Sequence, residues 1–183
     1  MTPIFRCHFS QISHRRSELK IRTEHKYIGA ALMQIAEHEQ FTAINAMKIK
    51  GESINNAFKI NNNIGLLCKY ASEPNGGGEY LFTFQADHVA AIEKITKHND
   101  HAFIALVCIE DAEICCLTVD QFNTLIESRK KSAGHDEDLY QILVTAEQGN
   151  SLRAYVNAAG KKGRVARKKL IIARKAFPSD LFG

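Results

Sequence analysis

Long hydrophobic runs and a secretion leader are both missing from this sequence. The longest apolar run, residues 102–109, suits a buried strand and is far shorter than the roughly 20 residues that span a bilayer. The first 16 residues lack a continuous apolar segment followed by a small-residue cleavage site, which argues against secretion. We therefore expect a cytoplasmic protein that makes no membrane contact.

Familiar motifs for metals, nucleotides and base recognition are missing as well. Residues 74–78, PNGGG, lack the Gly-Lys-Ser/Thr ending of a phosphate-binding Walker loop. The five cysteines are odd in number, and the adjacent Cys115 and Cys116 would point to opposite faces of a strand, away from any shared zinc ion. We expect core thiols, no bound metal and no cofactor. The sequence also shows no zinc finger, recognition helix or RNA-recognition motif.

The composition is that of one globular domain. Of the 183 residues, 45% are hydrophobic and 24% are charged, values that argue against a disordered chain and a fibrous repeat. A chain of this length can bury a substantial core. We predict a single domain over residues 1–183, with a basic N-terminal arm at 1–22 and a basic C-terminal segment at 160–176.

The hydrophobic pattern predicts a mixture of helices and strands. Predicted helices cover 23–40, 86–100 and 119–131, and predicted strands cover 41–49, 64–71, 79–84, 101–109, 113–118, 139–145 and 151–158. Strand-helix-strand connections favour an α/β fold, with α+β as the alternative, in which helices flank one mixed β-sheet.

Local signals refine this fold. Thr23 and Asp87 are the predicted N-caps of the first two helices. The Asn-rich residues 53–65 are predicted to form a turn, because Asn tolerates turn conformations, and the strands on either side of it would form a meander with 79–84. The apolar side chains near the C-terminus are expected to dock on the body of the domain; they are Phe177, Leu181 and Phe182.

Charge is distributed unevenly along the chain. Residues 1–26 carry six Lys or Arg and two acids, residues 27–160 carry ten and seventeen, and residues 161–183 carry eight and one. The sixteen residues from 160 to 175 include eight Lys or Arg and no acid. Such segregation indicates a localised contact with a polyanion.

Apolar residues interrupt the basic segment, so we expect an ordered strand or short helix there. Ordered cations lose less freedom when they bind phosphate groups. We predict a nucleic-acid partner, and a duplex in preference to a single strand, because few aromatic residues accompany the charges. The predicted phosphate-binding residues are Arg164, Arg167, Lys168, Lys169, Arg174 and Lys175, with Arg15 and Arg16 as a second wall of the same groove.

A protein partner is the alternative hypothesis. The basic segment would then meet an acidic protein surface, or the acidic middle of a second copy of the chain in a homo-oligomer. Self-association that salt disrupts in the absence of nucleic acid would favour this alternative.

The order of helix, strands, helix and strand over residues 20–110 resembles the core of restriction-endonuclease-like nucleases of the PD-(D/E)xK class. In that family an acid of the first helix, an Asp at a strand turn and a (D/E)xK pair bind Mg²⁺. Glu24 occupies the position of the helix acid and Lys69 that of the strand lysine, whereas Asn63 and Leu67 occupy the positions of the other two acids. The resemblance implies an inactive or strongly altered descendant; an active member would be a metal-dependent nuclease that uses Mg²⁺.

Overall fold

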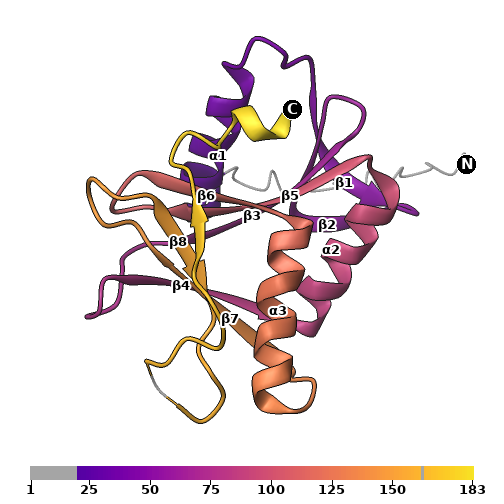
Figure 1. Ribbon diagram of the computed structural model, residues 1–183. Helices are drawn as coiled ribbons and strands as arrows, with labels where there is room; N and C mark the ends of the chain where they lie inside the picture. The colour runs from indigo at the N-terminus through magenta and orange to yellow at the C-terminus, as the bar shows by residue number, and fades with distance from the viewer. Residues whose placement is uncertain (1–19, 162) are drawn as a thin grey trace, which may run out of the picture.

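The computed structural model describes residues 20–161 and 163–183. Its helices are α1 (Thr23–Ala36), α2 (Ala86–His98), α3 (Val119–Ala133) and the short 3₁₀ helix η1 (Ser179–Leu181). Its strands are β1 (Ile44–Ile49), β2 (Glu52–Ile60), β3 (Ile64–Ala71), β4 (Glu79–Gln85), β5 (His101–Cys108), β6 (Glu113–Thr118), β7 (Leu139–Thr145), β8 (Leu152–Tyr155) and β9 (Leu170–Ile172). The α/β class predicted from the sequence is confirmed (Figure 1).

The strands form two sheets in place of the one mixed sheet that we expected. A five-stranded sheet has the order β1-β2-β3-β5-β6 and is antiparallel except for the parallel pair β3 and β5. A four-stranded antiparallel sheet has the order β4-β7-β8-β9. The predicted meander is wrong at β4, because β4 leaves the first sheet and pairs along its whole length with β7, from Glu79 opposite Thr145 to Gln85 opposite Leu139.

The Asn-rich segment contains a strand that the sequence did not predict. Residues 52–60 form β2, and only the stretch at Asn61 is a turn. Asn56 has a positive φ of 54°, which disturbs the alternation that marks a strand. Asn61 behaves as we expected of a turn residue: its side-chain oxygen accepts hydrogen bonds from the Thr42 amide and hydroxyl at 2.8 and 2.9 Å.

The N-caps of α1 and α2 also differ from the prediction. Arg22 and Gln85 are the N-caps, and Thr23 and Asp87 lie inside the first turn. In both helices a histidine three residues after the cap accepts a hydrogen bond from the cap amide: His25 Nδ1 from Arg22 N at 3.2 Å, and His88 Nδ1 from Gln85 N at 3.1 Å. Each histidine thus satisfies the backbone amide of the cap residue, which is the role of the third helical residue in a capping box.

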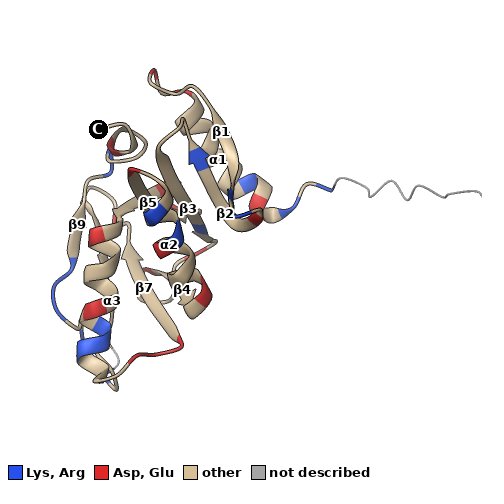
Figure 2. Cartoon of the chain, turned by 90° about the vertical axis from the view of Figure 1, so that its right-hand side faces the viewer, with Lys and Arg blue, Asp and Glu red and all other residues tan. Residues whose placement is uncertain are grey.

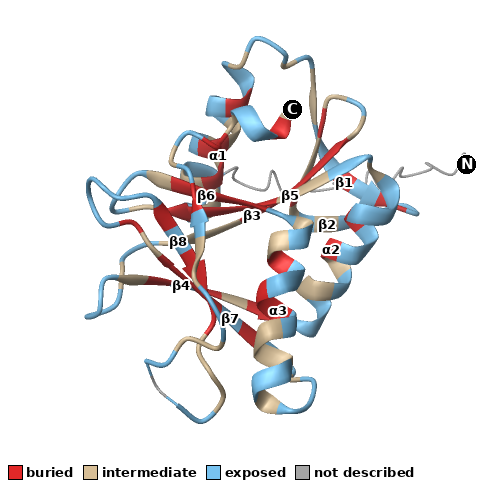
Figure 3. Ribbon diagram, in the orientation of Figure 1, coloured by how far each residue is buried: buried red, intermediate tan, exposed pale blue. Residues whose placement is uncertain are grey.

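Two hydrophobic cores lie on opposite faces of the five-stranded sheet (Figure 3). One is closed by the four-stranded sheet with α2 and α3, and the other by α1 and the C-terminal residues. Adjacent Cys115 and Cys116 belong to different cores, as predicted from strand alternation. The four cysteines within the described residues are free and buried, which agrees with core thiols.

The C-terminal residues dock on the body of the domain, which confirms that prediction. Phe177 and Leu181 are buried against the core that α1 covers. Phe182 stacks on the His38 ring with a centroid distance of 4.2 Å. Across residues 20–161 and 163–183, every helix is too short or too polar to cross a membrane.

Gly65 in β3 lies directly against the C-terminal half of α2. A Cβ atom there would lie 2.3 Å from Ile95 Cγ2 and 2.9 Å from Asn99 Nδ2. We predict that Gly65→Ala lowers the free energy of unfolding by about 1–3 kcal/mol through overpacking. Urea unfolding followed by circular dichroism measures this, since the chain has no tryptophan.

Gly29→Ala is the matched control for Gly65→Ala. Gly29 lies in α1, where an added Cβ atom would meet nothing within 4 Å. Alanine there should raise stability by up to about 1 kcal/mol through helix propensity. Equal urea midpoints for Gly65→Ala and the parent chain would contradict close packing between α2 and β3.

Candidate nucleic-acid interface

The basic C-terminal segment forms most of the loop between β8 and β9. We call residues 157–169 the basic loop. Its backbone is ordered by a bridge between Asn157 and Val165 and by hydrogen bonds from Ala158 N to Arg164 O at 2.6 Å and from Ala166 N to Val156 O at 2.9 Å. Among the described residues of the segment only Leu170–Ile172 form a strand, so these residues are ordered as predicted, but mainly as a hairpin loop.

Helix α3 holds the start of this loop in place. Arg129 donates to Glu137 through Nε and Nη2 at 2.5 and 2.6 Å, and through Nη1 to the Asn157 carbonyl at 2.9 Å. Ser132 Oγ accepts from the Ala159 amide at 2.9 Å. The hydrogen bonds from Arg129 hold the pKa of Glu137 below its usual value, and Glu137 raises the pKa of Arg129. A paired guanidinium thus fixes the loop against the helix.

An open groove of about 760 Å³ lies between α3 and the basic loop. We call it the α3 groove. Figure 2 shows the Lys and Arg residues of the loop on the same side of the molecule as those at the C-terminal end of α3. The lining residues are Asp120, Asn123, Thr124, Glu127, Ser128, Lys131, Ser132, Ala166 and Arg167.

Three predicted phosphate-binding residues are available on the loop. Arg164, Arg167 and Lys168 are exposed, and none forms a side-chain hydrogen bond or ion pair with another described residue. Lys131 of α3 is also exposed and shares the groove with Arg167. No sequence pattern indicated a role for Lys131, because it is the fold that brings α3 beside the basic loop.

Lys169 lies on the outer face of the four-stranded sheet. Its ammonium is 4.0 Å from the centroid of the Tyr155 ring, and the Tyr155 hydroxyl donates to Glu79. The hydrogen bond from Tyr155 is the main reason that the pKa of Glu79 is lowered, and Lys169 adds to this effect. Lys169 therefore lies near a carboxylate and packs on an aromatic ring of the same sheet. Arg153, on the same face, is exposed and was also missed by sequence reasoning.

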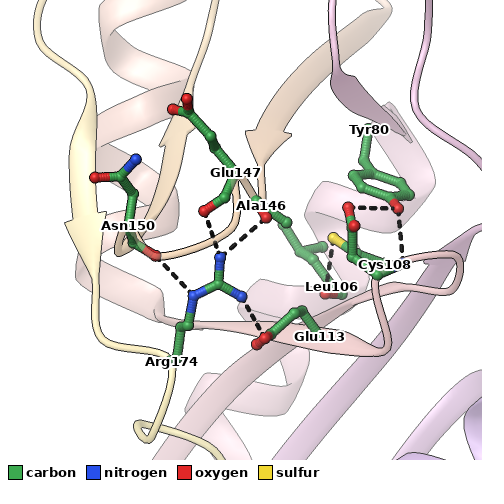
Figure 4. Close-up of polar contacts among 9 residues, drawn as sticks. Tyr80, Leu106, Cys108, Glu113, Ala146, Glu147, Asn150 and Arg174 are labelled. Atoms are coloured by element: carbon green, nitrogen blue, oxygen red, sulfur yellow. Dashed lines mark hydrogen bonds and ion pairs between the residues drawn. The ribbon is translucent and has the colours of Figure 1, made fainter.

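The prediction that Arg174 binds phosphate requires a correction, because its guanidinium already donates hydrogen bonds to other parts of the protein (Figure 4). Nη1 donates to Glu113, Nε to the Asn150 carbonyl at 2.7 Å, and Nη2 to the carbonyls of Ala146 and Glu147 at 2.9 and 2.6 Å. These bonds tie the end of β9 to the loop after β7. Arg174 is thus a structural anchor and is not free to bind phosphate.

Of the remaining predicted phosphate-binding residues, only Lys175 belongs to the described part of the chain, and it lies apart from the α3 groove. Lys175 is exposed and lines a different hollow, next to Asn150 and Arg174. Arg15 and Arg16 lie outside the described residues. The described part of the basic arm, with Arg22, leads into α1, which covers the opposite face of the five-stranded sheet from the one that carries α3.

The two residues that carry the nuclease resemblance are not brought together. Glu24 lies on α1 beside β2, on one side of the five-stranded sheet. Lys69 of β3 points to the other side, with its ammonium 5.1 Å from the centroid of Phe84 and its pKa lowered by burial. Among the described residues, no three His, Cys, Asp or Glu side chains gather as metal ligands would. These residues do not fit the Mg²⁺ site that the resemblance implies.

Comparisons with known proteins identify no family for this chain. No protein-family model matches the chain, and no curated protein or solved structure is significantly similar to it.

Arg174→Ala should lower the free energy of unfolding by about 2–4 kcal/mol, because it removes the donor to Glu113 and to three loop carbonyls, of which only that of Glu147 keeps a backbone bond, from Asn150 N. Lys175→Ala is the control, since this exposed neighbour makes no side-chain bond to a described residue and should change stability by less than about 0.5 kcal/mol. Urea unfolding compares them. Equal stability of the two variants would rule out the anchoring role.

The pair formed by Arg129 and Glu137 gives a pH dependence of stability. The folded pKa of Glu137 lies below its ordinary value of 4.5, so the pair stabilises the fold above about pH 4.5, and the contribution is lost as the pH falls through the folded pKa. We predict that Glu137→Gln lowers stability by about 1–2 kcal/mol at pH 7, and that this difference shrinks as the pH falls below 4.5 towards the folded pKa of Glu137.

Asp138→Asn is the control for this pH series, because Asp138 is exposed and unbonded within the described residues. Its stability difference from the parent chain should stay near zero at each pH. If the difference for Glu137→Gln were the same at pH 3 and pH 7, the ion pair would not be its cause.

Proposed function

We propose that this protein binds the phosphate backbone of a double-stranded nucleic acid through the basic loop and the adjoining end of α3. The observation that carries the proposal is the cluster of exposed and unpaired cations Arg164, Arg167 and Lys168, with Lys131 beside them. Phosphate contacts supply most of the affinity in non-specific binding of this kind.

The preorganised loop supports the proposal. Arg129 and Ser132 hold the loop against α3, so its cations are displayed on an ordered backbone before any ligand arrives. Less conformational freedom is then lost on binding than in a disordered basic tail.

The lack of stacking surfaces favours a duplex over a single strand. No aromatic residue lines the α3 groove among the described residues, and the nearby Tyr155 is buried under Lys169. Single-strand binders use exposed aromatic rings on which bases stack. A duplex presents its phosphates without requiring such rings.

Fluorescence-anisotropy titrations of labelled duplexes across a salt series test the proposal. About four phosphate contacts should give a slope near −4 in a plot of log K against log salt concentration. Arg164→Glu/Lys168→Glu should weaken binding at least tenfold and reduce the magnitude of the slope by about 2.

Lys94→Glu/Lys97→Glu makes the same change of net charge on α2, where both residues are exposed. It should change affinity less than about threefold, because the removed charges lie away from the proposed contact. Equal losses in the two variants would show an effect of net charge alone. If no duplex bound even at low salt, the proposal would fail and an acidic protein partner would remain as the hypothesis.

A further inference from the structure

One wall of the α3 groove carries a run of hydrogen-bond acceptors, and the exposed amide of Asn123 on the same wall can both accept and donate. Thr124 Oγ1 donates its proton to the Asp120 carbonyl at 2.8 Å, and Ser128 Oγ donates its proton to the Thr124 carbonyl at 2.6 Å. A hydroxyl group has a single proton. With that proton already used inside the helix, each of these oxygens can only accept a hydrogen bond from a ligand.

Two carboxylates extend the same wall. Asp120 is exposed, and no described side chain or amide donates to its carboxylate. Glu127 contacts Lys130 Nζ at 3.5 Å and remains largely exposed. Ionised carboxylates accept hydrogen bonds and donate none. We call Asp120, Thr124, Glu127 and Ser128 the acceptor row; it runs along one helix face for about 12 Å at 1.5 Å per residue.

Donors line the same groove. Lys131 follows the acceptor row on α3, and Arg167 projects from the basic loop. Ammonium and guanidinium groups donate hydrogen bonds and accept none. A ligand that fills the groove must therefore offer acceptors to Lys131 and Arg167 and donors to the acceptor row.

The backbone of DNA does not meet both requirements. Its phosphate and deoxyribose oxygens are all acceptors, so the acceptor row would repel them. RNA adds a 2′-hydroxyl to each nucleotide, which both donates and accepts, and in an A-form duplex these hydroxyls line the wide, shallow minor groove beside the phosphates. An A-form RNA duplex therefore offers both the donors and the acceptors that the two groups of residues in the α3 groove require.

We infer that the α3 groove binds double-stranded RNA, with ribose 2′-hydroxyls donating to the acceptor row and phosphates bound by Arg167 and Lys131. The inference rests on the proposed function and names the class of nucleic acid for the same surface. The absence of aromatic side chains from the lining of the groove, among the described residues, fits a ligand whose bases stay stacked.

Three duplexes of one sequence test this inference by anisotropy: RNA, DNA and fully 2′-O-methylated RNA. The methylated duplex keeps the A-form geometry and the 2′-oxygen acceptor, but it has no 2′ donor. The parent chain should bind RNA at least fivefold more tightly than either of the others.

Asp120→Asn/Glu127→Gln tests the acceptor row directly. The amides keep the shape of the side chains, remove the repulsion and can donate, so DNA and methylated RNA should bind more tightly and the RNA preference should fall below about twofold. The control Glu37→Gln/Glu39→Gln removes two exposed carboxylates near the end of α1. It should shift all three affinities by one common factor and keep the RNA preference.

The outcomes separate this inference from the proposed function. Equal affinity for RNA and DNA, or for RNA and methylated RNA, would overturn the inference while leaving phosphate binding by the basic loop intact. Loss of the RNA preference in the Glu37→Gln/Glu39→Gln control would also overturn it, because the effect would not depend on the groove. Failure of all three duplexes to bind at low salt would refute both.

Discussion

Burial of the five-stranded sheet on both faces is the constraint on which the rest of the structure depends. Its central strands β3 and β5 run parallel and carry buried residues toward each face. Each face consequently needs its own cover. α1 and the C-terminal residues cover one face, and α2, α3 and the four-stranded sheet cover the other. Because this second sheet is an outer layer, its loops face solvent, and the basic loop is one of them.

Two arginines hold the loops of the four-stranded sheet in place through hydrogen bonds to backbone carbonyls. Arg129 joins the start of the basic loop to α3, and Arg174 joins the end of β9 to the loop after β7. Both donate to backbone carbonyls that lie outside regular strands. A cation used in this way is not available to a ligand. The chain thus uses Arg174, one of the cations in its basic segment, to order that segment.

Local sequence patterns predicted the buried strands β3, β5 and β6, because a short continuous apolar run is typical of a buried strand. They did not predict β2, where Asn55 and Asn56 interrupt the alternation, or the division into two sheets, which depends on pairing between β4 and the distant β7. The sequence revealed the basic segment, but it could not show which of its cations are free to bind a ligand. Arg174 is bonded to carbonyls and a carboxylate, whereas Arg167 lines the groove, and this difference arises only in the folded chain. Lys131 joins the groove through tertiary packing alone.

Attraction and selectivity reside in different elements of the proposed interface. Cations of the loop attract any polyanion, and a contact of about four phosphates gives binding that is weak at physiological salt and insensitive to sequence. The acceptor row on α3 adds nothing to this attraction, but it disfavours a ligand without donors. The two effects combine only while the loop stays against the helix. Arg129 and Ser132, which touch no ligand in this arrangement, are therefore the residues on which discrimination depends.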